Sequence, residues 1–92
     1  MNTTKHSVVI TAYEYSVLRE NSMIAGACAW LFELAIEHDD EVELVITLSE
    51  LADLIGFVAA EANHARSKRK SEDLNEICDY LESIEQDIKR QK

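Results

Sequence analysis

The residues best suited to chemistry are a glutamate and a histidine, Glu61 and His64, three positions apart. On a helix they lie one turn apart on the same face, where both could bind one metal ion. A complete site also needs a carboxylate from a facing helix, and the candidate is Glu33. Glu33 points away from the apolar stripe of its own segment, and His64 falls on a polar side. The pattern therefore predicts no metal and no other cofactor.

Other candidates for catalysis have no partners at a suitable spacing. His38 falls at the end of a predicted helix, where a histidine complements the helix dipole, and His6 lies in a polar start. No serine, cysteine and histidine form a recognisable nucleophilic set, and no glycine-rich phosphate loop is present. We therefore expect a protein that is not an enzyme.

Composition and hydrophobic spacing predict an all-α fold. The chain has 92 residues, no proline and two glycines, and 47% of its residues are hydrophobic. These values favour a single domain of helices joined by short polar turns. We expect a small antiparallel bundle of about three helices, at about 22–38, 41–68 and 72–89, preceded by an irregular or short-strand arm in which residues 1–10 are flexible.

The middle helix, 41–68, has the most regular spacing. Its apolar residues recur every three or four positions, at Leu44, Leu48, Leu51, Ile55, Val58, Ala62 and Ala65. Asp40 with Glu43 predicts a cap for its start. A rival interpretation makes 42–47 a strand and begins the helix at Leu48, but the unbroken spacing favours one helix. A continuous rod through the third helix stays open as an alternative.

Residues 8–15 allow two interpretations. Their β-branched density favours a strand, whereas Thr11 with Glu14 fits a capping box that would begin a helix. We favour the extended arm, because residues 19–22 are typical of a turn that ends in a capping serine, Ser22.

The predicted helices 22–38 and 41–68 are apolar over more than one stripe. A three-helix bundle covers one stripe on each helix, and exposing the others would cost several kcal/mol, at ~25 cal/mol per Å². We therefore predict a homodimer.

Charge and one aromatic residue point to a protein partner. Eighteen acidic against nine basic residues give a net charge of −9, which opposes contact with nucleic acids or anionic membranes and favours a basic partner. Phe57 lies off the apolar stripe, in line with carboxylates. An aromatic anchor ringed by acids is typical of a protein-binding spot. The predicted partner-binding residues are Ile46, Glu50, Asp53, Phe57, Glu61 and His64.

The third helix carries an acidic ridge, made of Glu72, Asp73, Glu76, Asp79 and Glu82. It is either a solvated face or a mimic of phosphates, since carboxylates one turn apart repeat every ~5–6 Å along a helix. The ridge therefore suggests an inhibitor, or a nucleic-acid-mimicking antagonist, of a basic partner.

The segment Leu48–Val58 resembles the first helix and turn of helix-turn-helix domains. Ala52 and Gly56 have the separation that these domains use, and the basic residues within 66–70 could contact phosphates. The resemblance implies an alternative function, a small DNA-binding regulator that uses residues 48–70. The following segment is less polar than the DNA-facing helix of that family, and the net charge opposes DNA binding.

The cysteines and the start of the chain predict a cytoplasmic location. Cys28 and Cys78 are the only two cysteines, and the first dozen residues lack an apolar core followed by a small-residue cleavage site. Two such cysteines are typical of reduced, buried thiols. The longest apolar run is too short to cross a membrane.

Overall fold

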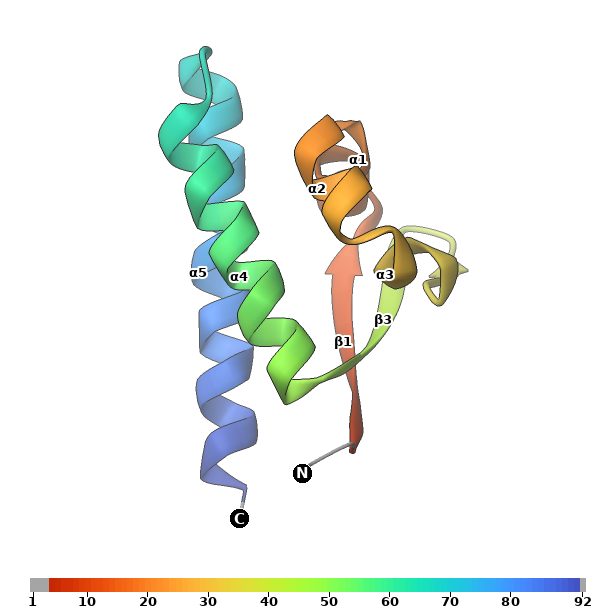
Figure 1. Cartoon of the computed structure of the whole chain (residues 1–92). Helices are drawn as coiled ribbons and strands as arrows, with labels where there is room; N and C mark the ends of the chain where they lie inside the picture. Colours follow the sequence, from red (N-terminus) through yellow and green to blue (C-terminus); the bar gives the residue numbers. More distant parts are fainter. Residues whose placement is uncertain (1–3, 92) are drawn as a thin grey trace.

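The computed structural model describes residues 4–91 and shows a mixed α/β fold (Figure 1). Helices pack against one face of a three-stranded antiparallel sheet. The elements in chain order are β1 (Lys5–Thr11), α1 (Ala12–Glu20), α2 (Ser22–Ala27), α3 (Ala29–Glu33), β2 (Ile36–His38), β3 (Glu41–Thr47), α4 (Leu48–His64) and α5 (Lys68–Arg90). The predicted all-α bundle is therefore wrong.

The sheet has the strand order β1-β3-β2, and its side chains alternate between the core and solvent. Val8 pairs with Leu44, and Ile10 pairs with Val42. These four side chains and Ile46 are at most 2% exposed, whereas their neighbours along the strands point to the open face. A two-residue period of this kind places one face of a sheet on the core.

Residues 41–47 form a strand, so the predicted single helix over 41–68 is wrong and the rejected alternative is correct. Helix α4 begins at Leu48 with Thr47 as its cap: the Thr47 hydroxyl accepts from the Glu50 amide at 3.1 Å, and the Glu50 carboxylate accepts from the Thr47 amide at 2.9 Å. The predicted cap at Asp40 does not form. Asp40 lies in the β2–β3 turn, where its carbonyl accepts from the Ala12 amide at 2.7 Å.

The predicted helix 22–38 is also wrong, because it divides into α2, α3 and β2. Cys28 leaves the helical region, with φ −116° and ψ 32°, and ends α2. Residues 36–38 then pair with β3. The helix does begin at Ser22, but the capping side chain is that of Asn21, which accepts from the Ile24 amide at 3.0 Å.

Both interpretations of residues 8–15 hold in part. The chain is a strand to Thr11, and a helix follows directly with the predicted capping box between Thr11 and Glu14. Residues 5–11 are not a flexible arm, because Val8 and Ile10 are core residues. Residues 1–3 of the predicted arm lie outside the described part of the chain.

Helices α4 and α5 are separate and lie side by side as an antiparallel pair (Figure 1). The break follows from Ala65, whose ψ of 133° is extended, and from Ser67, whose hydroxyl caps α5 by accepting from the Lys70 amide at 3.1 Å. α5 thus begins earlier than the predicted residue 72. The apolar stripe predicted for this helix is confirmed in its buried part, which consists of Leu74, Ile77, Cys78 and Leu81.

The structure changes part of the premise of the dimer prediction. Of the apolar residues expected to stay uncovered, Phe32, Val45 and Ala59 are half-buried, whereas Ala29, Ile36 and Ala52 are exposed. That prediction counted residues 41–47 as part of a widely apolar helix, but Val42, Leu44 and Ile46 are covered within the chain by sheet pairing and by the helices. The homodimer itself stays a prediction.

Candidate protein-binding surface

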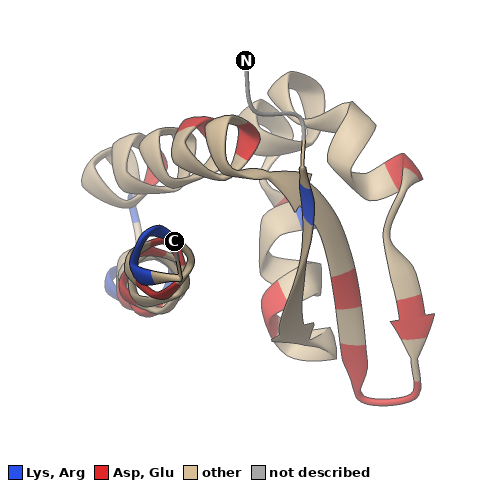
Figure 2. Cartoon of the chain, turned by 90° about the horizontal axis from the view of Figure 1, so that it is seen from below, with Lys and Arg blue, Asp and Glu red and all other residues tan. Residues whose placement is uncertain are grey.

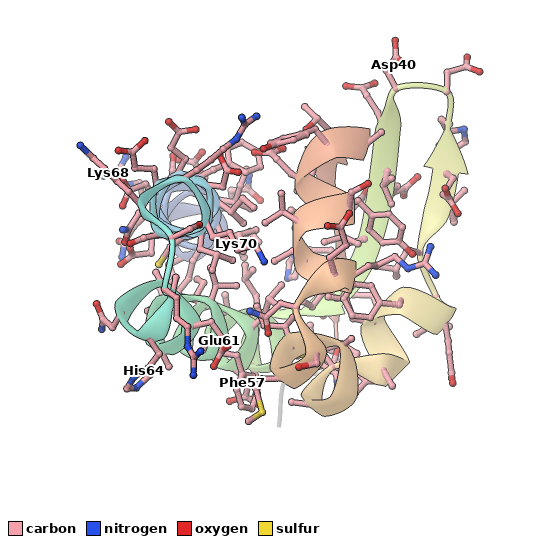
Figure 3. All side chains as sticks on the ribbon, turned by 90° about the horizontal axis from the view of Figure 1, so that it is seen from above. Asp40, Phe57, Glu61, His64, Lys68 and Lys70 are labelled. Atoms are coloured by element: carbon pink, nitrogen blue, oxygen red, sulfur yellow. The ribbon has the colours of Figure 1, made fainter. Side chains whose placement is uncertain are left out.

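The outward side of α4 carries the exposed aromatic residue that the sequence singled out. Phe57 is 42% exposed, and Asp53 one turn before it is also exposed. Phe57, Glu61 and His64 follow one another along this helix (Figure 3). We call the exposed side of this helix the α4 surface; it consists of Ala52, Asp53, Gly56, Phe57, Ala60 and His64.

Two of the predicted partner-binding carboxylates already have partners within the chain. Glu50 accepts from the Thr47 amide and forms an ion pair with Lys5 at 3.5 Å. The backbone hydrogen bond from Thr47 is the main reason that the pKa of Glu50 is lowered. Glu61 accepts from the side-chain amide of Asn21 at 3.0 Å and so ties α4 to the start of α2. Both carboxylates border the α4 surface, but each also has a structural role.

Ile46 is wrongly included among the predicted partner-binding residues. Its side chain is 0% exposed, because it lies on the core face of β3. The error follows directly from treating residue 46 as helical: on a strand, its direction is set by alternation with Leu44 and not by a helical turn from Phe57.

Gly56 has no role within the fold that requires a glycine. It lies in a helix without a positive φ, and a Cβ atom added to it would meet nothing within 4 Å. Gly26 in α2, the other glycine of the chain, is equally open. A glycine inside a helix costs about 1 kcal/mol relative to alanine. Packing within the chain therefore does not explain why residue 56 is a glycine. The absence of a side chain there would allow another molecule to approach the backbone closely.

Helix α2, which Asn21 ties to α4, carries a second exposed apolar side chain. Met23 is 66% exposed, the largest value among the exposed large hydrophobic side chains of the described residues. It lies two positions after Asn21, whose side chain bonds Glu61 one turn beyond Phe57. The sequence did not predict the exposure of Met23, because Met23 fell within the apolar run of the predicted helix 22–38.

The acidic ridge is only partly a free surface. Glu72, Glu76, Asp79 and Glu82 are exposed on α5. By contrast, Asp73 is half-buried and accepts from the Tyr13 hydroxyl at 2.6 Å. The Cys78 thiol lies 3.5 Å from a Glu82 carboxylate oxygen and donates to it. Four of the five ridge carboxylates are therefore exposed, and one of these four, Glu82, also accepts from a side chain of its own helix.

The open face of the sheet gathers a serine, a glutamate and a histidine. The Ser7 hydroxyl donates to one Glu43 oxygen at 2.7 Å, and His38 Nε2 lies 3.9 Å from the other. A nucleophilic serine needs the histidine beside its hydroxyl, but here the carboxylate stands between them. This arrangement holds the strands together and does not activate Ser7.

Carboxylates crowd the hairpin of β2 and β3, where Figure 2 shows red segments at the turn and no blue. Among residues 4–91, no group of three or more histidine, cysteine, aspartate or glutamate side chains could hold a metal ion. Asp39, in the turn, has a φ of 50°, a conformation that aspartate tolerates better than most residues.

The structure lacks the turn expected from the resemblance to helix-turn-helix domains. α4 runs without interruption from Leu48 to His64, through Gly56. The next helix, α5, begins only after Ser67 and folds back along α4. The segment is thus one half of a helical hairpin, and the resemblance is not confirmed.

The described part of the chain contains no helix that is both long enough and apolar enough to cross a membrane. Comparisons of the chain with protein-family models, with curated proteins and with solved structures find no match.

Proposed function

We propose that this protein is not an enzyme and acts by binding a basic protein through the α4 surface. One observation carries the proposal: Phe57 is exposed beside a glycine, Gly56, whose open flank serves no purpose within the fold. An aromatic side chain next to a bare stretch of backbone offers a partner both an anchor and room for close approach.

The charge around Phe57 supports a cationic partner with an apolar centre. Asp53 is exposed one turn before Phe57, and Glu61 lies one turn after it. Arginine or lysine side chains of the partner would meet these carboxylates, while an apolar side chain packs on Phe57 and Met23. The net charge of −9 would increase the rate of encounter with such a partner and would weaken the complex at high salt.

A second copy of this chain is a less favourable occupant of the α4 surface. Two copies would bring two chains of charge −9 together, and Asp53 would face a carboxylate-rich surface. Sedimentation equilibrium tests the homodimer prediction directly: a dimer that Phe57→Asp dissociates would assign the surface to self-association and contradict a basic partner.

Inhibition of a nucleic-acid-binding partner is a more specific form of this proposal. The outward carboxylates Glu72, Glu76 and Asp79 would take the place of phosphates on that partner. We also propose a cytoplasmic location, since both cysteines are free and buried. DNA binding through residues 48–70 is less well supported, because the expected turn is absent and the charge of the chain is negative.

The proposal is tested by affinity capture from a native extract with matched variants. Phe57→Asp and Gly56→Leu should each lose the same basic protein, because one removes the anchor and the other fills the open backbone. Ile36→Asp is the control, since Ile36 is 45% exposed but lies on the sheet.

Binding of the purified partner then separates the outcomes. We expect Phe57→Asp to weaken binding by about 2 kcal/mol or more, as for a central anchor, and Ile36→Asp to leave it unchanged. Equal binding by the wild type and by Phe57→Asp, with both folded by circular dichroism, would rule out the α4 surface.

A further inference from the structure

A groove lies between α1 and the start of α5, away from the outward side of α4. Its volume is about 480 Å³, which is within the range of small-molecule sites. Helix α1 and the residue after it contribute Tyr13, Ser16, Val17, Glu20 and Asn21. The opposite wall is formed by Ser67, Arg69, Lys70, Asp73 and Leu74.

One hydrogen bond joins the two walls of this groove. The Tyr13 hydroxyl donates to Asp73 at 2.6 Å, and the Tyr13 side chain with Asp73 raises the pKa of Arg69. Arg69, Tyr13 and Asp73 therefore form one polar cluster in which the charges of Arg69 and Asp73 offset each other. This cluster fixes the spacing of α1 and α5 and leaves the other charged residues of the groove free.

The remaining charged groups are one cation and one anion on opposite walls. Lys70 lies on α5 and Glu20 on α1, and within residues 4–91 neither side chain forms an ion pair or a hydrogen bond. Figure 3 shows that Lys70 points from α5 toward α1, whereas Lys68 points away from it. Lys70 is thus free to neutralise a ligand, and Lys68, two positions earlier, is not placed to do so.

The polar cluster with Tyr13 and Asp73 accounts for Arg69, but it leaves Lys70 without a partner on either wall. Arg66, Lys68, Arg69 and Lys70 are four of the nine basic residues of the chain, and three of them lie in the first turn of α5. Cations at a helix N-terminus are disfavoured by the helix dipole. The same residues also follow the C-terminus of α4 at His64, where cations are favoured, so the two dipole effects offset each other. The feature that calls for a ligand is therefore the position of Lys70, which lines the groove without a partner.

Two apolar side chains line the same groove as the two free charges. Val17 is half-buried and Leu74 is 3% exposed, and both line the groove. A ligand that binds here could place a short hydrocarbon body on them. Its two ends would then meet Lys70 and Glu20.

We propose that this groove binds a small zwitterion: a short apolar body with a carboxylate at one end and an ammonium group at the other. The carboxylate would pair with Lys70 and the ammonium group with Glu20. An ω-amino acid or a short apolar peptide has this chemistry. The proposal does not depend on the α4 surface, because the two sites share no residue.

The test is a titration of the ¹⁵N-labelled full chain, followed by amide chemical shifts. The probes are 6-aminohexanoate, trialanine, hexanoate and hexylammonium. We expect 6-aminohexanoate to give saturable shifts at Val17, Asn21, Lys70 and Leu74, and to bind more tightly than either probe with a single charge. Tighter binding by trialanine than by 6-aminohexanoate would indicate a peptide as the source of the zwitterion.

Charge variants distinguish specific binding in the groove from nonspecific binding of the probes to the protein surface. Lys70→Gln and Glu20→Gln should each weaken 6-aminohexanoate binding by about tenfold, the loss expected for one charge-assisted contact. Lys68→Gln and Glu33→Gln are the controls and should leave it unchanged. The proposal is overturned if the shifts are not saturable, if hexanoate binds as well as 6-aminohexanoate, or if Lys70→Gln and Lys68→Gln behave alike while both keep the native spectrum.

Discussion

The hydroxyl of Tyr80 in α5 donates a hydrogen bond of 2.5 Å to the backbone carbonyl of Val9 in β1. The two residues are 71 positions apart. The bond satisfies one carbonyl on the strand edge that β3 does not pair, and it fastens the last helix to the first strand. The Tyr80–Val9 hydrogen bond thus links the C-terminal helix directly to the edge of the sheet.

Tyr80→Phe should lower the free energy of unfolding by about 1 kcal/mol, because it removes this hydrogen bond and little else. Burial, and then the charges of Glu14 and Glu41, raise the pKa of Tyr80 above its ordinary value of 10.0. The stability that the neutral phenol contributes is complete below that value and is lost as the pH rises through the raised pKa. Urea denaturation at neutral and at alkaline pH would measure both effects. A wild type and a Tyr80→Phe variant that lose equal stability above pH 10 would contradict this assignment.

Glu50→Gln should make unfolding less sensitive to acid. The backbone amide of Thr47 is the first cause that lowers the pKa of Glu50 below its ordinary value of 4.5, and Lys5 adds to the effect. The carboxylate therefore stabilises the fold above that value, and the contribution is lost as the pH falls through the lowered pKa. Glutamine keeps an acceptor for the capping box, so the change at neutral pH should stay below about 1 kcal/mol. Acid titrations followed by circular dichroism would compare the variant with Glu76→Gln, a change at an outward carboxylate.

Gly56→Ala should raise the free energy of unfolding by about 0.5–1 kcal/mol, because alanine suits a helix interior and its Cβ would meet open space. Thermal denaturation would measure the gain. If the glycine serves a partner, Gly56→Leu should keep the fold and lose the partner. A Gly56→Ala variant less stable than the wild type would show that the glycine is needed within the chain.

Ile46→Ala should destabilise the protein by about 2–5 kcal/mol, since it opens a cavity under a fully buried strand residue. Phe57→Ala should cost much less, because Phe57 is already 42% exposed. Chemical denaturation of the two variants would separate a core residue from a surface residue. Equal losses would mean that Phe57 is also part of the core.

Cys78 should react slowly with iodoacetamide in the native protein at about pH 8. Burial is the main cause that raises the pKa of its thiol to about 11, and Glu82 adds to the shift. The reactive thiolate is therefore scarce, and access is also limited. Mass spectrometry of samples labelled with and without denaturant would measure the protection. Rapid alkylation of Cys78 under native conditions would contradict the buried position.

Local chemistry could be read correctly from the sequence. The capping box of Thr11 and Glu14 and the buried stripe of α5 around Leu81 depend on neighbours a few positions away, and both are found in the structure. The exposure of Phe57 was also foreseen, because its direction depends only on the helix in which it lies.

The strands could not be predicted in the same way. Leu44 continues the helical spacing of Leu48 and Leu51, so one residue fits two periods at once. What decides between them is pairing with Val8, which lies far away in the sequence and contributes no local signal. The groove between α1 and α5 was missed for the same reason: Glu20 and Lys70 come close only after the chain has folded back.

The pairing of β1 with β3 has a consequence for the order of folding. The first strand of the chain finds its partner only when residues 41–47 have been synthesised, after three helices and β2 have passed. During translation, the apolar side chains of Val8 and Ile10 therefore stay exposed until β3 has been synthesised. By contrast, α4 and α5 are adjacent in the sequence and can pack together as soon as both have been synthesised. A nascent chain stalled before residue 41 should consequently be prone to aggregation, and its solubility should depend on chaperones.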